Sequence, residues 1–256
     1  AAEIGALAVL GHADVEVAAR PRVAIVATGD EVVPVDETPL PHQGRESNSW
    51  ALQAQVDACG GEAERLGIAP DEPVGLRSML ERALATADVV LTIGGISKGS
   101  HDLVHPTLAE LGVETVFHGV RLKPGKPTYF GVCERDGRRR YVFGLPGNPA
   151  STFTVFDLLV RPMLVRWLGG EAGDWGARAK LGDTGWKANW REQAVPARLL
   201  PGAGGELELV LAKPSPSGDP FSLLEADCYA LVPPETARDA VTSVPVVGSA
   251  TGMRLP

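Results

Sequence analysis

The feature that most constrains the fold is an apolar run that ends in two glycines. Residues Val89 to Ile93 lack the alternation of polar and apolar side chains that marks a half-exposed strand. Such a run is typical of a strand buried on both faces, as in a parallel sheet covered by helices. Gly94 and Gly95 follow, and a helix is expected just beyond Asp102. A glycine turn between a buried strand and a helix start exposes backbone N–H groups that can bind an anion, although tight turns without a ligand also use glycine.

Composition limits the functions to consider. The chain has 256 residues and a net charge of −8, which argues against broad binding to nucleic acid or to an anionic membrane. Its apolar runs are shorter than the roughly 20 residues needed to span a membrane, and its first residues do not resemble a signal peptide. Cys59, Cys133 and Cys228 are widely spaced and form no metal-binding pattern. We therefore expect reduced cysteines and a cytoplasmic protein.

The periodicity of the chain predicts an alternation of strands and helices. Strands are expected at 22–28, 63–68, 89–93 and 113–122, a strand pair at 129–133 and 141–145, and helices at 49–59, 76–84, 103–111 and 150–168. This alternation is typical of a three-layer α/β/α domain with a mostly parallel sheet. The arginines at 138–140 are expected at the solvated tip of the strand pair.

The pattern changes after Gly169 and Gly170, where an acidic, glycine-rich stretch begins. Short β-like runs at 195–199, 207–211, 229–232 and 244–247 then alternate with turns rich in proline and glycine. Such runs are typical of a small all-β barrel or sandwich. We therefore expect residues 1–19 to be the remnant of a preceding domain, residues 20–170 to form the α/β domain, and residues 175–256 to form the all-β domain.

Unusual loops are predicted at the ends of several strands, at residues 28–31, 94–102, 123–127 and 145–149. Each is rich in glycine, proline or charged residues. Open α/β sheets bind ligands beyond the carboxyl ends of their strands. We therefore expect these four loops to lie together and to line one pocket.

The residue types in these loops predict a phosphorylated ligand handled with a divalent metal. Lys123 and Lys126 belong to Lys-Pro-Gly-Lys-Pro, in which two prolines stiffen the segment, and ammonium groups bind phosphate or another oxyanion. Asp30, Glu31 and Asp102 offer the carboxylate oxygens that Mg²⁺ prefers.

Two other kinds of function fit the sequence less well. A zinc site at His101 and His105 would need both histidines on one helix face, but a helix that begins at Leu103 leaves His101 outside it. A nicotinamide-dependent oxidoreductase would need a Gly-x-Gly-x-x-Gly turn with a downstream acid, and the sequence has no such turn.

Five motifs follow one another across residues 20–168. They are Thr-Gly-Asp-Glu at 28–31, Ser-Asn-Ser at 47–49, Gly-Gly-Ile-Ser-Lys-Gly at 94–99 with Asp102, Lys-Pro-Gly-Lys-Pro at 123–127, and Leu-Pro-Gly-Asn-Pro at 145–149. In order and spacing they resemble the molybdopterin molybdenumtransferase family, which includes the gephyrin E domain. Single-domain adenylylating relatives carry a Gly-Gly-Thr-Gly turn, so the Gly-Gly-Ile-Ser turn and the lysine motif indicate the molybdate-inserting branch.

The resemblance implies a transferase whose substrates are adenylylated molybdopterin and molybdate. The adenylate would be cleaved with Mg²⁺, and molybdenum would enter the dithiolene. The implied catalytic residues are Asp30, Ser97 and Asp102, and the implied metal ligands are Asp30, Glu31 and Asp102. The residues implied in substrate binding are Thr28, Gly29, Asn48, Gly94, Gly95, Gly99, Lys123, Gly125, Lys126, Gly147, Asn148 and Ser222. Among them, Lys123 and Lys126 would hold the oxyanion, and Ser222 lies in a segment that loosely resembles part of the family's C-terminal barrel.

The resemblance also shows departures and an alternative function. Ser100 and His101 stand where the family often has other residues, and Glu46 stands where it often has aspartate. Longer relatives carry two more N-terminal domains, which implies a homodimer in the full-length form and contact with other molybdenum-cofactor synthesis proteins. The alternative is a non-catalytic molybdopterin-binding or scaffold module, since residues 1–19 would supply only the last piece of that region.

Overall fold

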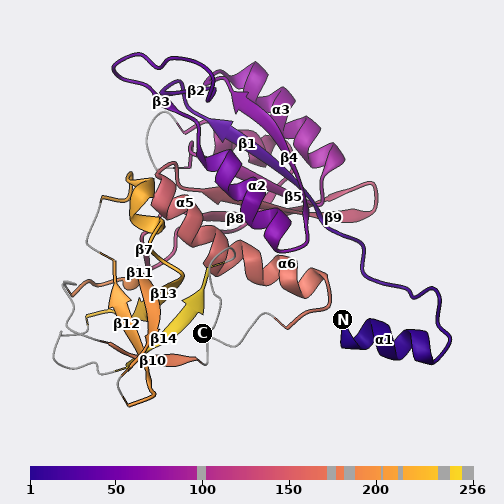
Figure 1. Cartoon of the computed structure of the whole chain (residues 1–256). Coiled ribbons are helices and arrows are strands. Elements are labelled where there is room, and N and C mark those ends of the chain that lie inside the picture. The colour runs from indigo at the N-terminus through magenta and orange to yellow at the C-terminus, as the bar shows by residue number, and fades with distance from the viewer. Residues whose placement is uncertain are drawn as a thin grey trace.

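The computed structural model describes residues 1–96, 102–171, 177–181, 188–202, 204–212, 216–235 and 243–249. It shows an α/β unit beside a small β-barrel (Figure 1). Two predicted site residues, Ser97 and Gly99, lie outside the described residues, as do Ser100 and His101. Within the described ranges, no helix has the length and apolar character needed to cross a membrane.

The larger sheet has the strand order β4-β1-β5-β9-β8-β6. Its strands are β1 (Arg22–Thr28), β4 (Glu62–Ala69), β5 (Val89–Ile93), β6 (Glu114–His118), β8 (Tyr129–Arg135) and β9 (Arg138–Leu145). β4, β1, β5 and β9 run parallel, whereas β8 runs antiparallel to both of its neighbours. The predicted mostly parallel sheet is therefore confirmed. A separate strand pair, β2 (Val32–Val33) and β3 (Gly44–Arg45), lies in the loop after β1.

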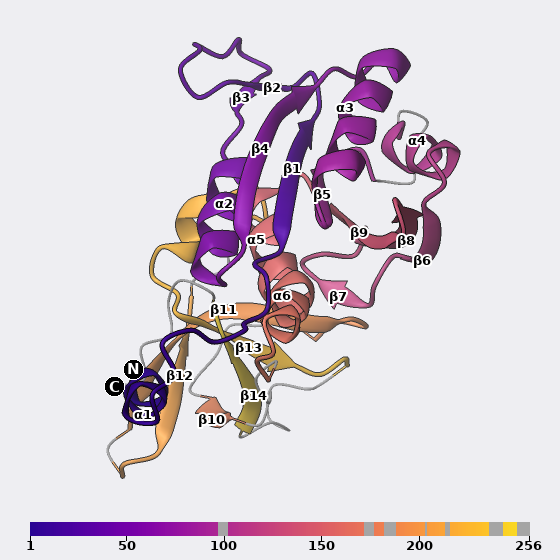
Figure 2. The same ribbon diagram turned by 90° about the vertical axis from the view of Figure 1, so that its right-hand side faces the viewer.

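Helices cover both faces of this sheet (Figure 2). They are α2 (Asn48–Ala58), α3 (Pro73–Thr86), α4 (Val104–Glu110), α5 (Pro149–Val155) and α6 (Arg161–Trp167), the last two joined by a π-helical turn at Phe156–Val160. In β1, Val26 packs in the core with α3 and α4, and Ile25 packs in the core with α2 and the π-helical turn. Because both faces of the strand are buried, its sequence has no polar alternation. The three-layer arrangement expected from the sequence is confirmed.

The second sheet closes into a barrel. Its strands are β10 (Arg178–Leu181), β11 (Glu192–Pro201), β12 (Leu207–Leu211), β13 (Cys228–Val232) and β14 (Ser243–Gly248), with a short 3₁₀ helix η2 at Pro220–Leu223. The order β12-β10-β14-β13-β11 is closed by pairing between β12 and β11. A barrel rather than a sandwich is thus the correct form of the predicted all-β unit, and β10 is a strand that the sequence patterns did not indicate.

One predicted strand is wrong in an informative way. The run expected at 113–122 is divided into β6 and a separate strand, β7 (Leu122–Lys123), with Gly119 between them at φ 105°. β7 leaves the larger sheet and pairs in parallel with the first residues of β11, in the barrel. The lysine motif therefore starts from a strand that is hydrogen-bonded to the barrel. The division into residues 20–170 and 175–256 remains a prediction, and β7 is a segment that crosses it.

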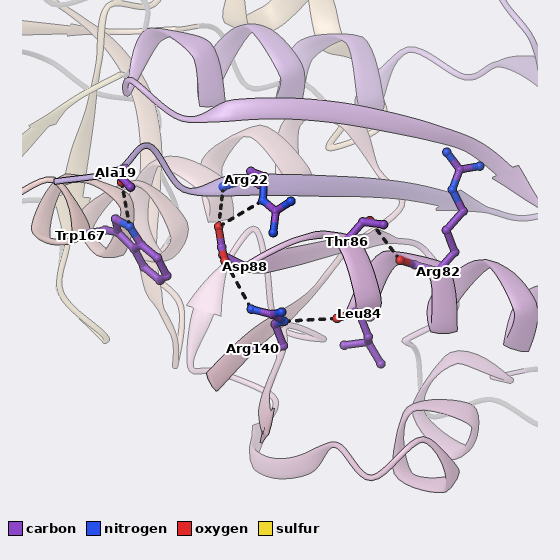
Figure 3. Close-up of polar contacts among 8 residues, drawn as sticks. All are labelled: Ala19, Arg22, Arg82, Leu84, Thr86, Asp88, Arg140 and Trp167. Carbon is purple, nitrogen blue, oxygen red and sulfur yellow. Dashed lines mark hydrogen bonds and ion pairs between the residues drawn. The ribbon is translucent and has the colours of Figure 1, made fainter. Parts of the chain in front are cut away.

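The arginine run was predicted to lie at a solvated tip, and this prediction is wrong for Arg140. Arg140 lies within β9 and is 3% exposed. Its Nη1 is 3.4 Å from Asp88 Oδ1, and its Nε donates to Leu84 O (Figure 3). Asp88 Oδ2 also accepts the backbone N–H of Arg22 at 2.9 Å. This cluster joins β1, β5 and β9 where the strands begin, at the opposite edge from the predicted site. Arg139 remains exposed, as expected.

The N-terminal segment lies apart from both units. It begins with α1 (Ala2–Val9), and none of the residues described in α1 is buried (Figure 1). Trp167 Nε1 donates to Ala19 O at 3.1 Å, which attaches the end of the segment to α6 (Figure 3). The assignment of residues 1–19 to a preceding domain remains a prediction.

Candidate functional site

The carboxyl ends of β1, β5 and β9 lie side by side. Ala27 pairs with Ile93, and Ile93 pairs with Leu145, so the loops that follow these strands leave the sheet at the same edge. β8 is antiparallel, and its first residue, Tyr129, pairs with Gly144 near the end of β9. The lysine loop, residues 123–127, therefore enters the sheet at this edge as well. The predicted position of these loops at one edge of the sheet is confirmed for their described residues. That they line one pocket remains a prediction.

The turn after β5 needs glycine at both positions. Gly94 and Gly95 have φ values of 79° and 62°, a region that side chains disfavour. A Cβ on Gly95 would lie 2.5 Å from Val104 Cγ2, and one on Gly94 would lie 3.1 Å from Thr28 Oγ1. Thr28 Oγ1 donates to Ile93 O at 2.9 Å, and Gly94 N–H donates to Leu145 O at 3.0 Å. The Thr28 side chain thus joins the end of β1 to β5, and a backbone bond joins the turn after β5 to the end of β9.

The two acidic residues after β1 make different local contacts. Asp30 Oδ1 accepts the backbone N–H of Asp71 at 3.4 Å, and the backbone N–H of Asp30 donates to Asp71 Oδ2 at 3.3 Å. The Glu31 carboxylate folds over Gly29 and occupies the space that a side chain on Gly29 would take. Gly29 has φ 120°, so its backbone also requires glycine. The loop is therefore shaped by the contacts of Asp30 with Asp71, outside the loop, and of Glu31 with Gly29, within it.

Asp102 lies at the entrance to α4 and is half-buried. Its Oδ1 accepts the backbone N–H of His105 at 3.4 Å. Burial raises the pKa of the Asp102 carboxyl, and this effect outweighs the opposing influence of the His105 hydrogen bond and of the His118 and His105 side chains. His118 Nε2 donates to Ile96 O at 3.0 Å, next to the segment 97–101. Asp102 thus lies where a nearby cation would stabilise its ionised form.

The described residues do not by themselves form a closed metal cage. No group of three or more His, Cys, Asp or Glu among them is arranged to hold a metal ion. Mg²⁺ is commonly held by one or two carboxylates together with substrate phosphates and water. The half-buried Asp102 carboxylate fits that kind of open site, and the carboxylates of Asp30 and Glu31 are of the right chemical type. The predicted ligation by these three residues remains a prediction.

The lysine loop is positioned by both units. Lys123 Nζ is 3.5 Å from Gln193 Oε1 in β11. Gly125, at φ 116°, packs so closely on α5 that a Cβ would lie 2.5 Å from Val155 Cγ2. Lys126 is exposed, and its backbone carbonyl accepts Val120 N–H at 2.9 Å. The loop therefore has a buried glycine anchor with an exposed cation on each side, as expected for a segment that presents positive charge to a ligand.

The loop after β9 joins three elements. Asn48 Nδ2, at the start of α2, donates to Gly147 O at 2.7 Å, and Asn148 Nδ2 donates to Ser217 Oγ at 2.9 Å. These contacts connect α2, the loop 145–149 and the segment before η2. Ser222 lies in η2, where its Oγ donates to Asp219 O at 2.9 Å. Asn48, Gly147 and Asn148 are thus brought together, and the role of Ser222 as an oxyanion contact remains a prediction.

Sequence reasoning missed two partners in this region. Asp71 pairs with Asp30, and Gln193 holds Lys123. Each lies far along the chain from its partner and in a segment without a motif, so only the three-dimensional arrangement reveals it. Glu46 has a role that its sequence position did not indicate: its Oε1 accepts Ser49 N–H at 2.8 Å and caps α2.

Comparison with known families identifies the family of this chain. Residues 24–166, more than half of the chain, match the family model described as "probable molybdopterin binding domain". The chain belongs to this molybdopterin-binding family. The matched region contains the glycine turn, Asp102, the lysine loop and the loop 145–149, and the family recognised from the sequence motifs is confirmed.

Curated relatives of this molybdopterin-binding chain carry one functional name. The molybdopterin molybdenumtransferase of a Nostoc species is 41% identical over 175 residues, which are 68% of this chain and 40% of that protein. Molybdopterin molybdenumtransferase 1 of Mycobacterium tuberculosis is 38% identical over 170 residues, which are 66% of this chain and 39% of that protein. The chain thus spans about 40% of the length of these relatives.

Solved structures extend the similarity beyond the α/β unit. The molybdopterin biosynthesis MoeA protein of Pyrococcus horikoshii matches 91% of this chain and 55% of its own, with a TM-score of 0.70 and 33% identity. A molybdenum cofactor biosynthesis protein of Pyrococcus furiosus matches 96% of this chain and 75% of its own, with a TM-score of 0.68 and 27% identity. These matches cover the barrel as well as the larger sheet and confirm the fold.

Proposed function

We propose that this chain is the catalytic region of a molybdopterin molybdenumtransferase. It would cleave adenylylated molybdopterin with Mg²⁺ and insert molybdenum from molybdate into the dithiolene. The observation that carries the proposal is the gathering of the loops after β1, β5 and β9, with the lysine loop, at one edge of the sheet. The names of the curated relatives and of the solved structures support the same pathway.

The proposed roles follow the chemistry of each loop. Gly94 would give the turn its shape, and the backbone N–H groups of Gly95, Ser97 and Gly99 would receive the phosphate. Lys123 and Lys126 would hold molybdate, because ammonium groups bind oxyanions. These residues would orient the two substrates at the same sheet edge.

The carboxylates would hold the metal. Asp102 is the leading candidate for a metal ligand, since it is half-buried and a cation would stabilise its ionised form. Asp30 and Glu31 would add carboxylate ligands from the loop after β1. Mg²⁺, when bound, would neutralise charge on the phosphate oxygens. Thr28, Gly29, Gly125, Asn48, Gly147 and Asn148 would shape the pocket, and Ser222 would add an oxyanion contact from the barrel side.

Three further features belong to the same proposal. We infer that the longer protein is a homodimer, that it acts in the cytoplasm, and that it contacts other molybdenum-cofactor synthesis proteins. The resemblance to the transferase family supports these inferences. Sedimentation of the longer protein measures its oligomeric state directly, and a monomer would contradict the first inference.

Release of AMP from adenylylated molybdopterin tests the proposed chemistry. We expect the chain to release AMP with Mg²⁺ and not with EDTA, and we expect Asp102→Ala to lower the rate at least about a hundredfold, the scale of losing one group that stabilises charge. Asp57→Ala, at an exposed position of α2, is the matched control and should retain the wild-type rate. Equal rates for Asp102→Ala and wild type would refute the role of Asp102. Binding without turnover would favour the scaffold alternative.

A further inference from the structure

His118 lies at the end of β6, and the proposed function gives its side chain no role. In the antiparallel register of β6 and β8, His118 pairs directly with Tyr129. Side chains of directly opposed residues lie on the same face of a sheet, and the two rings meet edge to face with 5.8 Å between their centroids. Tyr129 is buried. One side of the His118 ring is therefore set by a side chain in the core.

His105, from α4, provides a second neighbour for this ring. Its ring centroid lies 5.1 Å from that of His118 and 5.4 Å from that of Tyr129. His105 Nε2 is 3.3 Å from Thr115 Oγ1, and that hydroxyl donates to the hydroxyl of Tyr129 at 3.4 Å. The three rings thus form one packed cluster, in which hydrogen bonds hold both neighbours of His118.

The polar edge of the His118 ring holds the backbone of Ile96. Its Nε2 is 3.0 Å from Ile96 O, and because a carbonyl oxygen can only accept, this nitrogen carries the proton. The Ile96 side chain is buried, and it packs so closely on Gly144 that a Cβ there would lie 2.7 Å from Ile96 Cγ2. Ile96 is therefore fixed twice, through its side chain by the core and through its carbonyl by His118.

The glycine turn just before Ile96 has no side chains of its own to hold it. Gly94 and Gly95 both have positive φ, and glycine adopts many other conformations unless its surroundings restrain it. The bond from Gly94 N–H to Leu145 O restrains the first half of the turn. The N–H of Gly95 donates no hydrogen bond within the described part of the chain, so it is available to a ligand. The backbone is next held at the Ile96 carbonyl, by His118.

We propose that His118 is a positioning residue for the phosphate-binding turn. By donating to Ile96 O, it holds the backbone so that the Gly95 N–H faces the phosphate of the substrate. This inference rests on the proposed function, which places that phosphate at Gly95. Without the bond, the turn would have to be ordered by the ligand, at a cost in affinity. His118 acts through the backbone and makes no contact with the phosphate.

Pyrophosphate binding by variants of His118 tests this role. Inorganic pyrophosphate is titrated into the isotope-labelled chain in buffer with EDTA, and the shift of the Gly95 amide signal gives the Kd at the turn. His118→Phe keeps a ring against His105 and Tyr129 but removes the donor, and we expect the Kd to rise about tenfold, the scale of one hydrogen bond. His118→Gln places an amide N–H at a similar reach and should keep the Kd within about twofold of wild type.

Two further variants complete the comparison. His118→Asn, whose shorter amide does not reach Ile96 O, should bind as weakly as His118→Phe and serves as a second variant without the bond. His12→Phe is the matched control, because His12 is an exposed histidine of the N-terminal segment, outside both units. It should retain the wild-type Kd. Thermal unfolding of each variant measures its stability separately.

A merely structural role for His118 would lower the unfolding temperature of His118→Phe and leave its pyrophosphate Kd unchanged, and that result would overturn the inference. Equally weak binding by His118→Gln and His118→Phe would also overturn it, as would a wild-type Gly95 signal that does not shift at millimolar pyrophosphate. Pyrophosphate binding requires no turnover. Because AMP release is measured separately, failure of the transferase proposal would be recognised independently.

Discussion

At the scale of single residues, burial decides which side chains have unusual chemistry. Asp102 is half-buried and its carboxyl pKa is raised, whereas the exposed lysines of the loop 123–127 owe their position to the backbone around them. The sequence predicted site roles for Asp102, Lys123 and Lys126 because each lies in a compact motif. It could not predict the contact of Lys123 with Gln193, since that contact depends on residues far apart in the chain.

The raised pKa of Asp102 predicts a pH-dependent stability. In the folded state the carboxyl holds its proton to higher pH than in the unfolded chain, so stability is lost as pH rises through the interval between the two pKa values. Asp102→Asn keeps the oxygen that accepts His105 N–H and removes the ionisation. We therefore expect this variant to unfold at a higher temperature than wild type at pH 7, in buffer with EDTA. The difference should vanish near pH 3, and a difference that is independent of pH would contradict this explanation.

Burial also predicts that the Cys59 thiol is alkylated slowly. Burial raises the pKa of the Cys59 thiol to about 11, and it raises the pKa of the Cys133 and Cys228 thiols as well. Because the thiolate is the reactive form, we expect iodoacetamide at pH 8 to label Cys59 about a hundredfold more slowly than a free thiol of ordinary pKa. Mass spectrometry of labelled peptides in native buffer and in urea measures the ratio. Equal labelling under the two conditions would show that the thiol is not protected.

At the scale of helices and strands, the sequence predicted the elements whose periodicity is local. The strand at 22–28 and the helices on either side of the sheet follow from apolar spacing alone. The predicted strand at 113–122 failed because its pattern does not show that Leu122 and Lys123 leave one sheet and join another. The arginine run failed for a similar reason, since the pairing of Arg140 with Asp88 depends on the parallel pairing of β5 with β9.

The pair formed by Arg140 and Asp88 lies at the sheet edge opposite the site, and we expect its loss to lower the free energy of unfolding. Arg140→Met would leave the largely buried Asp88 carboxylate with only its Arg22 contacts, so we expect a loss of about 2 kcal/mol in the free energy of unfolding. Arg139→Met, one residue earlier and exposed, removes only a surface ion pair with Glu134 and should cost less than about 1 kcal/mol. Urea denaturation of the two variants measures the difference. Equal losses would mean that burial does not strengthen the Arg140 pair.

At the scale of the whole molecule, the barrel and the larger sheet share the candidate site. β7 pairs with β11, Lys123 contacts Gln193, and Asn148 contacts Ser217, so both units position the loops at the sheet edge. The sequence predicted both units and the convergence of the loops, because parallel strands place their carboxyl ends together. It did not predict that the barrel holds the lysine loop, since this arrangement arises from packing between distant segments.

The most direct test of the central claim is to measure AMP and molybdenum in a single reaction. The chain is mixed with adenylylated molybdopterin, Mg²⁺ and molybdate, and the AMP released is compared with the molybdenum bound in the molybdopterin product. We predict equal amounts of the two at every time point, because one site would cleave the adenylate and insert the metal. Release of AMP without molybdenum in the product, or formation of neither, would contradict the assignment of this chain as a molybdenum-inserting transferase.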